Sequence, residues 1–206
     1  MKISVFGATG NLGKRFVSTA LEKGHQIVAY VRSPEKMSFQ NENLTVIKGD
    51  VFDKDKIAKS IQGTDAVFIS WRMRSQKIPL FSEGTQNVVE CMKKNDIQRI
   101  IVMSEYAYGD HFRNFGFVMK GLTKLYGKMA KFQQNERRLQ DTAIYESGLD
   151  WTINRIRSLA DKPTKDFKMT LEPKSKVGSV SFESAASKIV SQFENPKEFI
   201  QKDIYF

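Results

Sequence analysis

The chain has 206 residues and a formal net charge of +10, from 33 Lys and Arg against 23 Asp and Glu. This length suffices for one hydrophobic core, so we expect a single domain spanning residues 1–206. No apolar segment approaches the length of a bilayer-spanning helix, and the first residues read as a strand rather than a charged-then-apolar leader. The sequence therefore predicts a soluble, cytoplasmic protein with no membrane partner. Its single cysteine, Cys91, excludes an internal disulfide and is expected to be buried on a helix.

The positive charge alone is compatible with nucleic acid, a membrane surface or anionic small molecules as partners. No nucleic-acid-reading module is recognisable, so we expect no nucleic-acid partner and assign the charge to attraction of an anionic cofactor and substrate. Part of the excess forms a helical ladder of lysines opposite an apolar series between residues 115 and 132. This ladder is either a solvated face or a contact surface for a substrate or an acidic partner. Its members are Lys120, Lys124, Lys128 and Lys131.

The first predicted strand, residues 3–6, runs directly into the glycine-rich segment G-A-T-G-N-L-G and then into a helical pattern ended by Gly24. Strand, glycine turn and helix in this order form the opening of a dinucleotide-binding βαβ unit. The glycines permit a tight turn, let the backbone approach a pyrophosphate and let the helix pack on the strand. Backbone N–H groups and the positive end of the helix dipole then replace the water around the phosphates. The expected cofactor-binding residues here are Gly7, Thr9, Gly10, Asn11, Leu12 and Gly13.

The second predicted strand, residues 26–31, ends at Arg32, where an NAD enzyme usually carries an acid for the ribose 2′-hydroxyl. Ser33 follows, and Lys36 lies one turn further on. Two cations and a hydroxyl suit a 2′-phosphate, so the sequence favours NADP(H) over NAD(H). The alternative is that both cations are merely solvated loop charges.

The rest of the chain alternates between strand and helix periods, which predicts a doubly wound α/β fold of Rossmann type. We expect one mostly parallel sheet of seven strands and a small C-terminal lobe on the substrate side. Predicted strands lie at 44–48, 65–69, 98–103 and 150–154, with short strands at 167–171 and 203–205. Predicted helices run from the N-cap Asp53 to Gly63, from Pro79 to about Asn95 and from Phe182 to Phe193, the last with Ser181 as N-cap.

Ligands of such sheets bind outside the carboxyl ends of the strands. This rule selects Ser104 and His111 after the strand at 98–103 as candidate catalytic residues. A histidine can donate a proton at neutral pH, but in a loop it can equally be just solvated, and Ser104 can simply satisfy the strand end. Further candidates follow the neighbouring strands, and their aromatic and cationic side chains suit a planar, anionic small molecule. These cofactor-binding candidates are Ser70, Trp71, Arg72, Arg74 and Arg155.

The chain resembles the atypical short-chain reductases with an NmrA-like NAD(P)H-binding domain and, among them, the flavin reductase and biliverdin reductase B family. The resemblance spans nearly the whole chain. It is carried by Gly7 to Gly13, Val31-Arg32-Ser33, Gly49-Asp50-Val51, Asp65-Ala66-Val67, Ser82-Glu83-Gly84 with Asn87-Val88-Val89, and Glu146-Ser147-Gly148-Leu149.

The resemblance implies NADPH extended across the sheet edge, with Arg32 and Lys36 at the 2′-phosphate, Asp50 and Val51 beside the adenine and Ser104 beside the nicotinamide. No metal is expected. This sequence departs from the family at Ser158, where the family has a histidine, and in a shorter loop before Pro79. The substrate therefore stays open.

The Tyr-x-x-x-Lys pair of the best-known short-chain dehydrogenases is missing, because no tyrosine has a lysine four residues later. The sequence thus argues against an alcohol dehydrogenase mechanism. It favours hydride transfer from NADPH to a planar acceptor such as a flavin, quinone or tetrapyrrole, in which positioning dominates. The alternative is an NADP(H)-binding sensor without turnover, resembling the NmrA-like regulators. A monomer and a homodimer are both compatible with the sequence.

Overall fold

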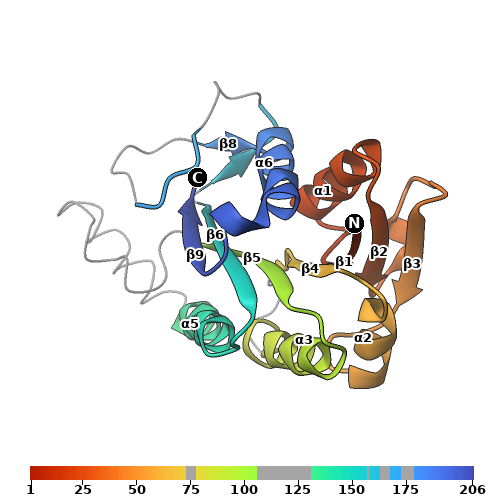
Figure 1. Ribbon diagram of the computed structural model, residues 1–206, viewed down its shortest axis with the longest axis horizontal. Helices are drawn as coiled ribbons and strands as arrows, with labels where there is room; N and C mark the ends of the chain where they lie inside the picture. The colour runs from red at the N-terminus through yellow and green to blue at the C-terminus, as the bar shows by residue number, and fades with distance from the viewer. Residues whose placement is uncertain (73–77, 106–130, 157, 163–167, 173–178) are drawn as a thin grey trace.

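Seven parallel strands form one sheet in the computed structural model of the chain, in the order β3-β2-β1-β4-β5-β6-β9 (Figure 1). The structure describes residues 1–72, 78–105, 131–156, 158–162, 168–172 and 179–206. The strands are β1 (Lys2–Phe6), β2 (Gln26–Val31), β3 (Leu44–Lys48), β4 (Ala66–Ile69), β5 (Arg99–Glu105), β6 (Asp150–Ile156) and β9 (Lys202–Tyr205). Within the described ranges, no helix combines the length and the apolar character needed to cross a membrane.

Helices cover both faces of the sheet (Figure 1). One face carries α1 (Asn11–Glu22) and α6 (Phe182–Glu194), and the other carries α2 (Lys54–Ile61), α3 (Ser82–Lys94) and α5 (Lys131–Tyr145). The predicted doubly wound Rossmann-type fold with seven strands is therefore confirmed. Outside the sheet lie two single-turn helices, η1 (Pro34–Lys36) and η3 (Pro196–Glu198), and a small parallel pair, β7 (Leu159–Ala160) and β8 (Val180–Ser181).

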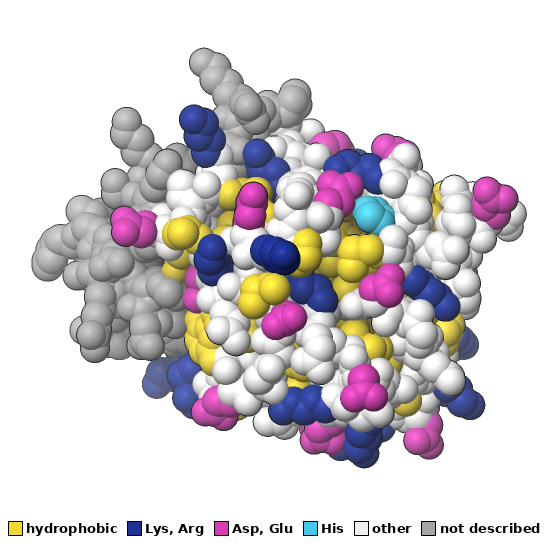
Figure 2. All heavy atoms as spheres, in the orientation of Figure 1, with side chains coloured by type: hydrophobic (Ala, Val, Ile, Leu, Met, Phe, Trp, Pro, Cys, Tyr) yellow, Lys and Arg dark blue, Asp and Glu magenta, His cyan; other side chains and the backbone are white. Residues whose placement is uncertain are grey.

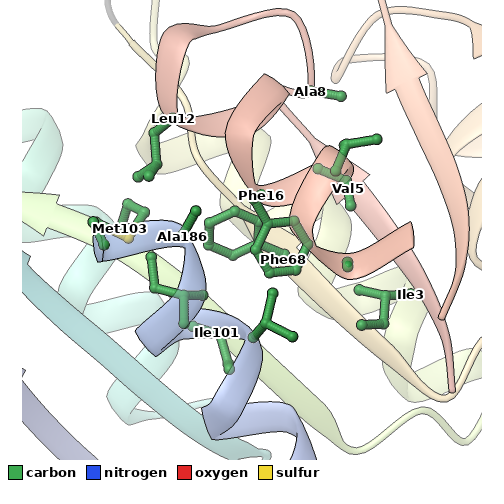
Figure 3. Packing of buried hydrophobic residues seen from close by; sticks show 14 of the residues in the cluster. Ile3, Val5, Ala8, Leu12, Phe16, Phe68, Ile101, Met103 and Ala186 are labelled. Atoms are coloured by element: carbon green, nitrogen blue, oxygen red, sulfur yellow. The ribbon is translucent and has the colours of Figure 1, made fainter. Parts of the chain in front are cut away.

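The core between the sheet and the pair α1 and α6 is built around Phe16 (Figure 3). The Phe16 ring lies 4.2 Å from the Phe68 ring, centroid to centroid, and 5.8 Å from the Phe193 ring of α6. A strand covered on both faces exposes no side to water, which is why β4 is fully buried along its length. This packing holds the carboxyl ends of β1 and β4 in fixed positions.

Two expected helix caps and the burial of Cys91 are confirmed. The side chain of Asp53 accepts a hydrogen bond from the Lys56 N–H, and that of Ser181 accepts one from the Ser184 N–H. Such caps stabilise a helix by about 1 kcal/mol each. Cys91 is buried against the second core, between the sheet and α2, α3 and α5.

Two expected boundaries are wrong. The helix expected from Pro79 begins at Ser82, because the residues before it form a turn and the helix takes its cap from α5 rather than from the proline. The strand expected at 167–171 is reduced, within its described residues, to an isolated antiparallel bridge between Thr170 and Tyr205. Thr170 exchanges two backbone hydrogen bonds with Tyr205 of β9, and the next residue, Leu171, is 60% exposed.

Part of the expected C-terminal lobe lies outside the described residues, as do Lys120, Lys124 and Lys128 of the lysine ladder. Lys131 is the first described residue of α5 and is exposed. On the face shown in Figure 2, the described cationic and acidic side chains are interspersed rather than gathered by sign. That face therefore presents no broad single-sign field to a polyanion.

Candidate functional site

The strand order reverses between β1 and β4: β2 and β3 are added on one side of β1, and β4 and the later strands are added on the other. A crevice forms at the carboxyl ends of such strands. Here the Ser70 N–H donates to the Phe6 carbonyl oxygen at 2.8 Å, which holds the two strand ends together. A cavity of about 370 Å3 opens above them. It is lined by Gly7, Thr9, Gly10, Tyr30, Val31, Arg32, Ser33, Lys36, Gly49, Asp50, Val51, Phe52, Ser70, Trp71, Arg72, Ile78 and Leu80.

The glycine turn at the floor of this cavity accepts no larger residue at two positions. Gly7 has a positive φ of 94°, and a Cβ there would lie 2.3 Å from the Ser70 carbonyl oxygen. A Cβ at Gly13 would lie 2.1 Å from the Gly7 carbonyl oxygen. Because α1 packs this tightly on the turn, its N-terminus is held at the strand end.

The N-terminus of α1 suits an anion. Its N-cap, Gly10, has no side chain to cap the helix, and its first turn contains no acid. The first N–H groups of a helix lack intrahelical partners, and the helix dipole adds positive potential at the same point. The bare backbone that the glycines leave at this end of α1 fits the pyrophosphate of a dinucleotide.

Two cations and a hydroxyl after β2 line the end of the cavity away from the glycine turn. Arg32 and Lys36 are exposed, Ser33 is half-buried, and all three line the cavity. Within the described residues, neither Arg32 nor Lys36 forms an ion pair with an acid. The acid between them in sequence, Glu35, does not line the cavity. This end can therefore meet a phosphate with two cations and a hydroxyl.

The wall beside Asp50 and Val51 is fixed by two hydrogen bonds from other elements. The Tyr30 hydroxyl donates to the Asp50 carbonyl oxygen at 2.7 Å, and the Asn87 amide of α3 donates to the Val51 carbonyl oxygen at 3.0 Å. Burial and, secondly, the charge of Asp53 raise the pKa of Tyr30, so its hydroxyl stays a neutral donor. Trp71 closes the wall against Gly84.

A second, open hollow borders the same wall between α2 and α3, and it does not suit a dinucleotide. Four carboxylate side chains line it against one cation, Lys54, which pairs with Glu90; the acids are Asp53, Asp55, Glu83 and Glu90. They would repel the phosphates that the glycine turn attracts.

Beyond the cavity, the ends of β5 and β6 carry a buried polar cluster. Arg155 of β6 is fully buried, and its Nη1 lies 2.6 Å from Asp141 Oδ2 of α5. Its Nε lies 2.7 Å from Asp203 Oδ1 of β9, and its Nη2 donates to the Tyr145 hydroxyl at 2.8 Å. Internal carboxylates thus hold the Arg155 guanidinium out of solvent, and Arg155 does not line the cavity described above, although the sequence predicts that it faces a ligand.

The charges in this cluster shift one another's titration. Burial lowers the pKa of Arg155, but the carboxylates of Asp141 and Asp203 more than reverse that, so its net pKa is raised. Burial raises the pKa of Asp141, an effect that Arg155 partly opposes. Burial also raises the pKa of Tyr145. Ser104 of β5 joins the cluster, since its Oγ donates to Asp141 Oδ1 and accepts from Arg155 Nη1, both at 3.2 Å.

The structure thus brings most of the predicted cofactor residues together and separates others from them. Asn11, Leu12 and Gly13 belong to the first turn of α1 without lining the cavity, and Ser104 and Arg155 lie in the buried cluster. Arg74 and His111 lie outside the described residues. Sequence reasoning missed Tyr30 and Asn87 behind the wall. It also missed three side chains that bind the Arg155 guanidinium in addition to Ser104, which are Asp141, Tyr145 and Asp203.

Comparison with known proteins agrees with this geometry. A family model described as NAD(P)H-binding matches residues 7–196. An uncharacterised chloroplast protein of Arabidopsis thaliana is 30% identical over 203 residues, covering 87% of this chain and 67% of that protein. For the photosystem II assembly factor Ycf39 of Synechocystis and a 3-beta-hydroxysteroid dehydrogenase of Mycolicibacterium neoaurum, the match covers only 33% and 31% of their lengths.

Solved structures share the fold at low identity. A short-chain dehydrogenase/reductase of Veillonella parvula in complex with NADP superposes with a TM-score of 0.80 at 21% identity, covering 99% of this chain and 93% of that one. ChuY, an anaerobilin reductase of Escherichia coli, superposes with a TM-score of 0.79 at 20% identity, covering 100% of this chain and 97% of that one.

Proposed function

Since this chain belongs to the NAD(P)H-binding family of reductase and dehydrogenase type, we propose that it is an NADPH-dependent reductase. The acceptor would be a planar, anionic small molecule such as a flavin, a quinone or a tetrapyrrole. The cavity lined by Arg32, Ser33 and Lys36 is the observation that carries this proposal. NADPH differs from NADH by one phosphate, and these side chains offer that phosphate two cations and a hydroxyl, against one acid, Asp50, among the lining residues.

Each part of the cavity takes one part of the cofactor in this proposal. The N-terminus of α1 binds the pyrophosphate, and the wall beside Asp50 and Val51 receives the adenine. The ends of β4 and β5 then receive the nicotinamide, beside Ser70 and Ser104. When bound, NADPH supplies the hydride, and a proton from solvent completes the reduction of the acceptor. The protein contributes mainly by holding the nicotinamide ring and the planar acceptor against each other in the orientation that hydride transfer needs.

The test compares affinities by calorimetry. Wild-type protein is expected to bind NADPH at least about tenfold more tightly than NADH, which is what a charge-assisted hydrogen bond supplies. Arg32→Ala should weaken NADPH binding by a similar factor and leave NADH binding almost unchanged. Lys59→Ala, on the exposed side of α2, removes the same charge away from the cavity and should alter neither affinity. Equal affinities of the wild type for both nucleotides would contradict the NADPH assignment.

A sensor that binds NADP(H) without turnover is the second candidate. It is favoured by the internal engagement of Ser104 and Arg155, which are drawn into contacts with Asp141 rather than presented to a substrate. NADPH oxidation with FMN, riboflavin, quinones and dyes separates the two functions. Turnover with any acceptor supports the reductase, whereas tight NADPH binding without any turnover supports the sensor.

A further inference from the structure

The Ser104 side chain is held from two sides by groups of opposite charge. Its Oγ lies 3.2 Å from Asp141 Oδ1 and 3.2 Å from Arg155 Nη1, and the residue is only 4% exposed. A serine hydroxyl has one proton to donate and two lone pairs to accept with. The chemistry of its two partners decides how these are used.

Arginine has donors only, so Ser104 Oγ must accept at the contact with Arg155. Asp141 binds the same Arg155 Nη1 through its other oxygen, Oδ2, at 2.6 Å. The 2.6 Å contact with the Arg155 guanidinium keeps Asp141 ionised even though burial raises its pKa. An ionised carboxylate only accepts, so Ser104 donates its proton to Asp141 Oδ1. The hydroxyl keeps one lone pair for any further partner and no proton.

Arg155 is held in this position by contacts on its other side. Its Nε lies 2.7 Å from Asp203 Oδ1, and its Nη2 donates to the Tyr145 hydroxyl, which itself donates to Asp203 Oδ2 at 2.9 Å. Side chains from three other elements, α5, β5 and β9, therefore converge on the guanidinium of Arg155. A network in which the members hold one another fixes the direction of the Ser104 hydroxyl.

Ser104 lies at the same level of the sheet as the cavity wall. In the register of β4 and β5, the last pair is Ile69 with Val102, so Ser104 lies two residues beyond that pair, at the carboxyl end of β5 next to the end of β4. Trp71 lines the cavity. A dinucleotide that runs from the glycine turn across these ends brings its nicotinamide to Ser104.

We infer that Asp141 and Arg155 are positioning residues that make the Ser104 hydroxyl a hydrogen-bond acceptor for the carboxamide N–H of the nicotinamide. Ser104 then orients the ring and supplies no proton to the acceptor, so the proton of the reduction comes from solvent. This inference rests on the proposed binding of NADP(H). It replaces the expectation that Ser104 takes part in the chemical step.

The 3-acetylpyridine analogue of NADP+ tests the direction of this hydrogen bond, because it keeps the carbonyl group of the carboxamide and has a methyl group in place of the NH2. Calorimetry gives the ratio of its Kd to that of NADP+. An accepting Ser104 loses its partner in the analogue, so wild type should bind the analogue about five- to tenfold more weakly. A donating Ser104 would bond the carbonyl group in both ligands, and the ratio would be near one.

Three variants complete the experiment. Ser104→Ala should bring the ratio close to one. Asp141→Asn can donate its amide to Ser104 Oγ and release the hydroxyl proton, so it should lower the ratio as well. Ser60→Ala is the matched control, since it removes another fully buried serine hydroxyl, one that donates to the Ile57 carbonyl oxygen in α2. It should keep the wild-type ratio.

A wild-type ratio near one, or an unchanged ratio in Ser104→Ala, would overturn the inference while leaving NADP(H) binding intact. No heat on titrating wild type with NADP+ or NADPH would instead overturn the proposed function from which the inference starts. If Asp141→Asn does not fold, wild type and Ser104→Ala decide the direction of the bond. Asp141→Glu then tests the role of the carboxylate, because it keeps that group and should keep the wild-type ratio of the two Kd values.

Discussion

The Glu136 carboxylate of α5 caps the N-terminus of α3 by accepting two hydrogen bonds from Ser82. The Ser82 N–H lies 3.1 Å from Glu136 Oε2, and the Ser82 hydroxyl lies 2.7 Å from Oε1. Both residues are buried. The negative charge also meets the positive end of the α3 dipole, so this single side chain fastens two helices together beside the site.

Glu136→Ala should lower the free energy of unfolding by about 2 kcal/mol, because a buried N–H loses its partner. For a protein of this size that corresponds to a Tm lower by about 4 to 8 °C. Urea and thermal unfolding measure both quantities. Glu83→Ala is the control, as Glu83 stands exposed in the first turn of the same helix. Equal losses of unfolding free energy in the two variants would show that the buried cap stabilises the protein no more than an exposed glutamate does.

Gly13→Ala and Gly10→Ala should separate folding from cofactor binding. A Cβ at position 13 would meet backbone at 2.1 Å, and relieving such an overlap costs about 1 to 3 kcal/mol or more. At Gly10, with an ordinary φ of −75°, the nearest contact is 3.3 Å.

We therefore expect Gly13→Ala to lose both stability and NADPH binding. Gly10→Ala should keep nearly wild-type stability and lose affinity, because its methyl group stands where the pyrophosphate approaches. Denaturant titration and calorimetry on the same samples check the split. A stable Gly13→Ala that binds normally would refute the close packing of α1 on the turn.

The sequence was sufficient to predict the seven strands of the main sheet and the glycine turn because both depend on local patterns. Buried parallel strands are continuous apolar runs such as Ala66–Ile69, and the turn needs glycine where backbone meets backbone. Both signals can be read within a few residues. The start of α3 was predicted wrongly since its cap comes from Glu136, 54 residues after Ser82.

Arg155 could not be interpreted from the sequence for the same reason. An arginine that ends a strand either faces a ligand or pairs with an internal carboxylate. The choice depends on Asp141 and Asp203, which lie 14 and 48 residues away on other elements. Only the packing of α5 and β9 against β6 brings those acids to the guanidinium, and no local pattern reports it.

NADPH binding should weaken with salt more steeply than NADH binding. Arg32 and Lys36 are exposed, and the screening length falls from about 10 Å at 0.1 M salt to about 3 Å at 1 M. The extra phosphate of NADPH depends on these cations, whereas the rest of the two nucleotides is the same. Calorimetry of both ligands across this salt range measures the two slopes. In the double variant Arg32→Ala, Lys36→Ala the slopes should coincide, and a difference that persists there would place the phosphate elsewhere.

The difference in unfolding free energy between wild type and Tyr30→Phe should become smaller as the pH rises. At neutral pH the substitution removes the hydrogen bond to the Asp50 carbonyl oxygen, a loss of about 1 kcal/mol. The pKa of Tyr30 is raised by burial above its ordinary value near 10, so the native state favours the neutral phenol. The stability that this preference contributes is complete below pH 10 and is lost as the pH rises through the raised pKa.

Above pH 10 the wild type should therefore lose up to about 1.4 kcal/mol per pH unit that Tyr30→Phe does not lose. Urea unfolding of both proteins at several pH values between 8 and 11 measures the gap between them, which should shrink above pH 10. Ser60→Ala also removes a buried hydroxyl that donates to a carbonyl oxygen, but it removes no titrating group in this range, so its gap to wild type should stay constant. A Tyr30→Phe gap that is equally constant would mean that the Tyr30 phenol ionises as readily in the fold as in the unfolded chain.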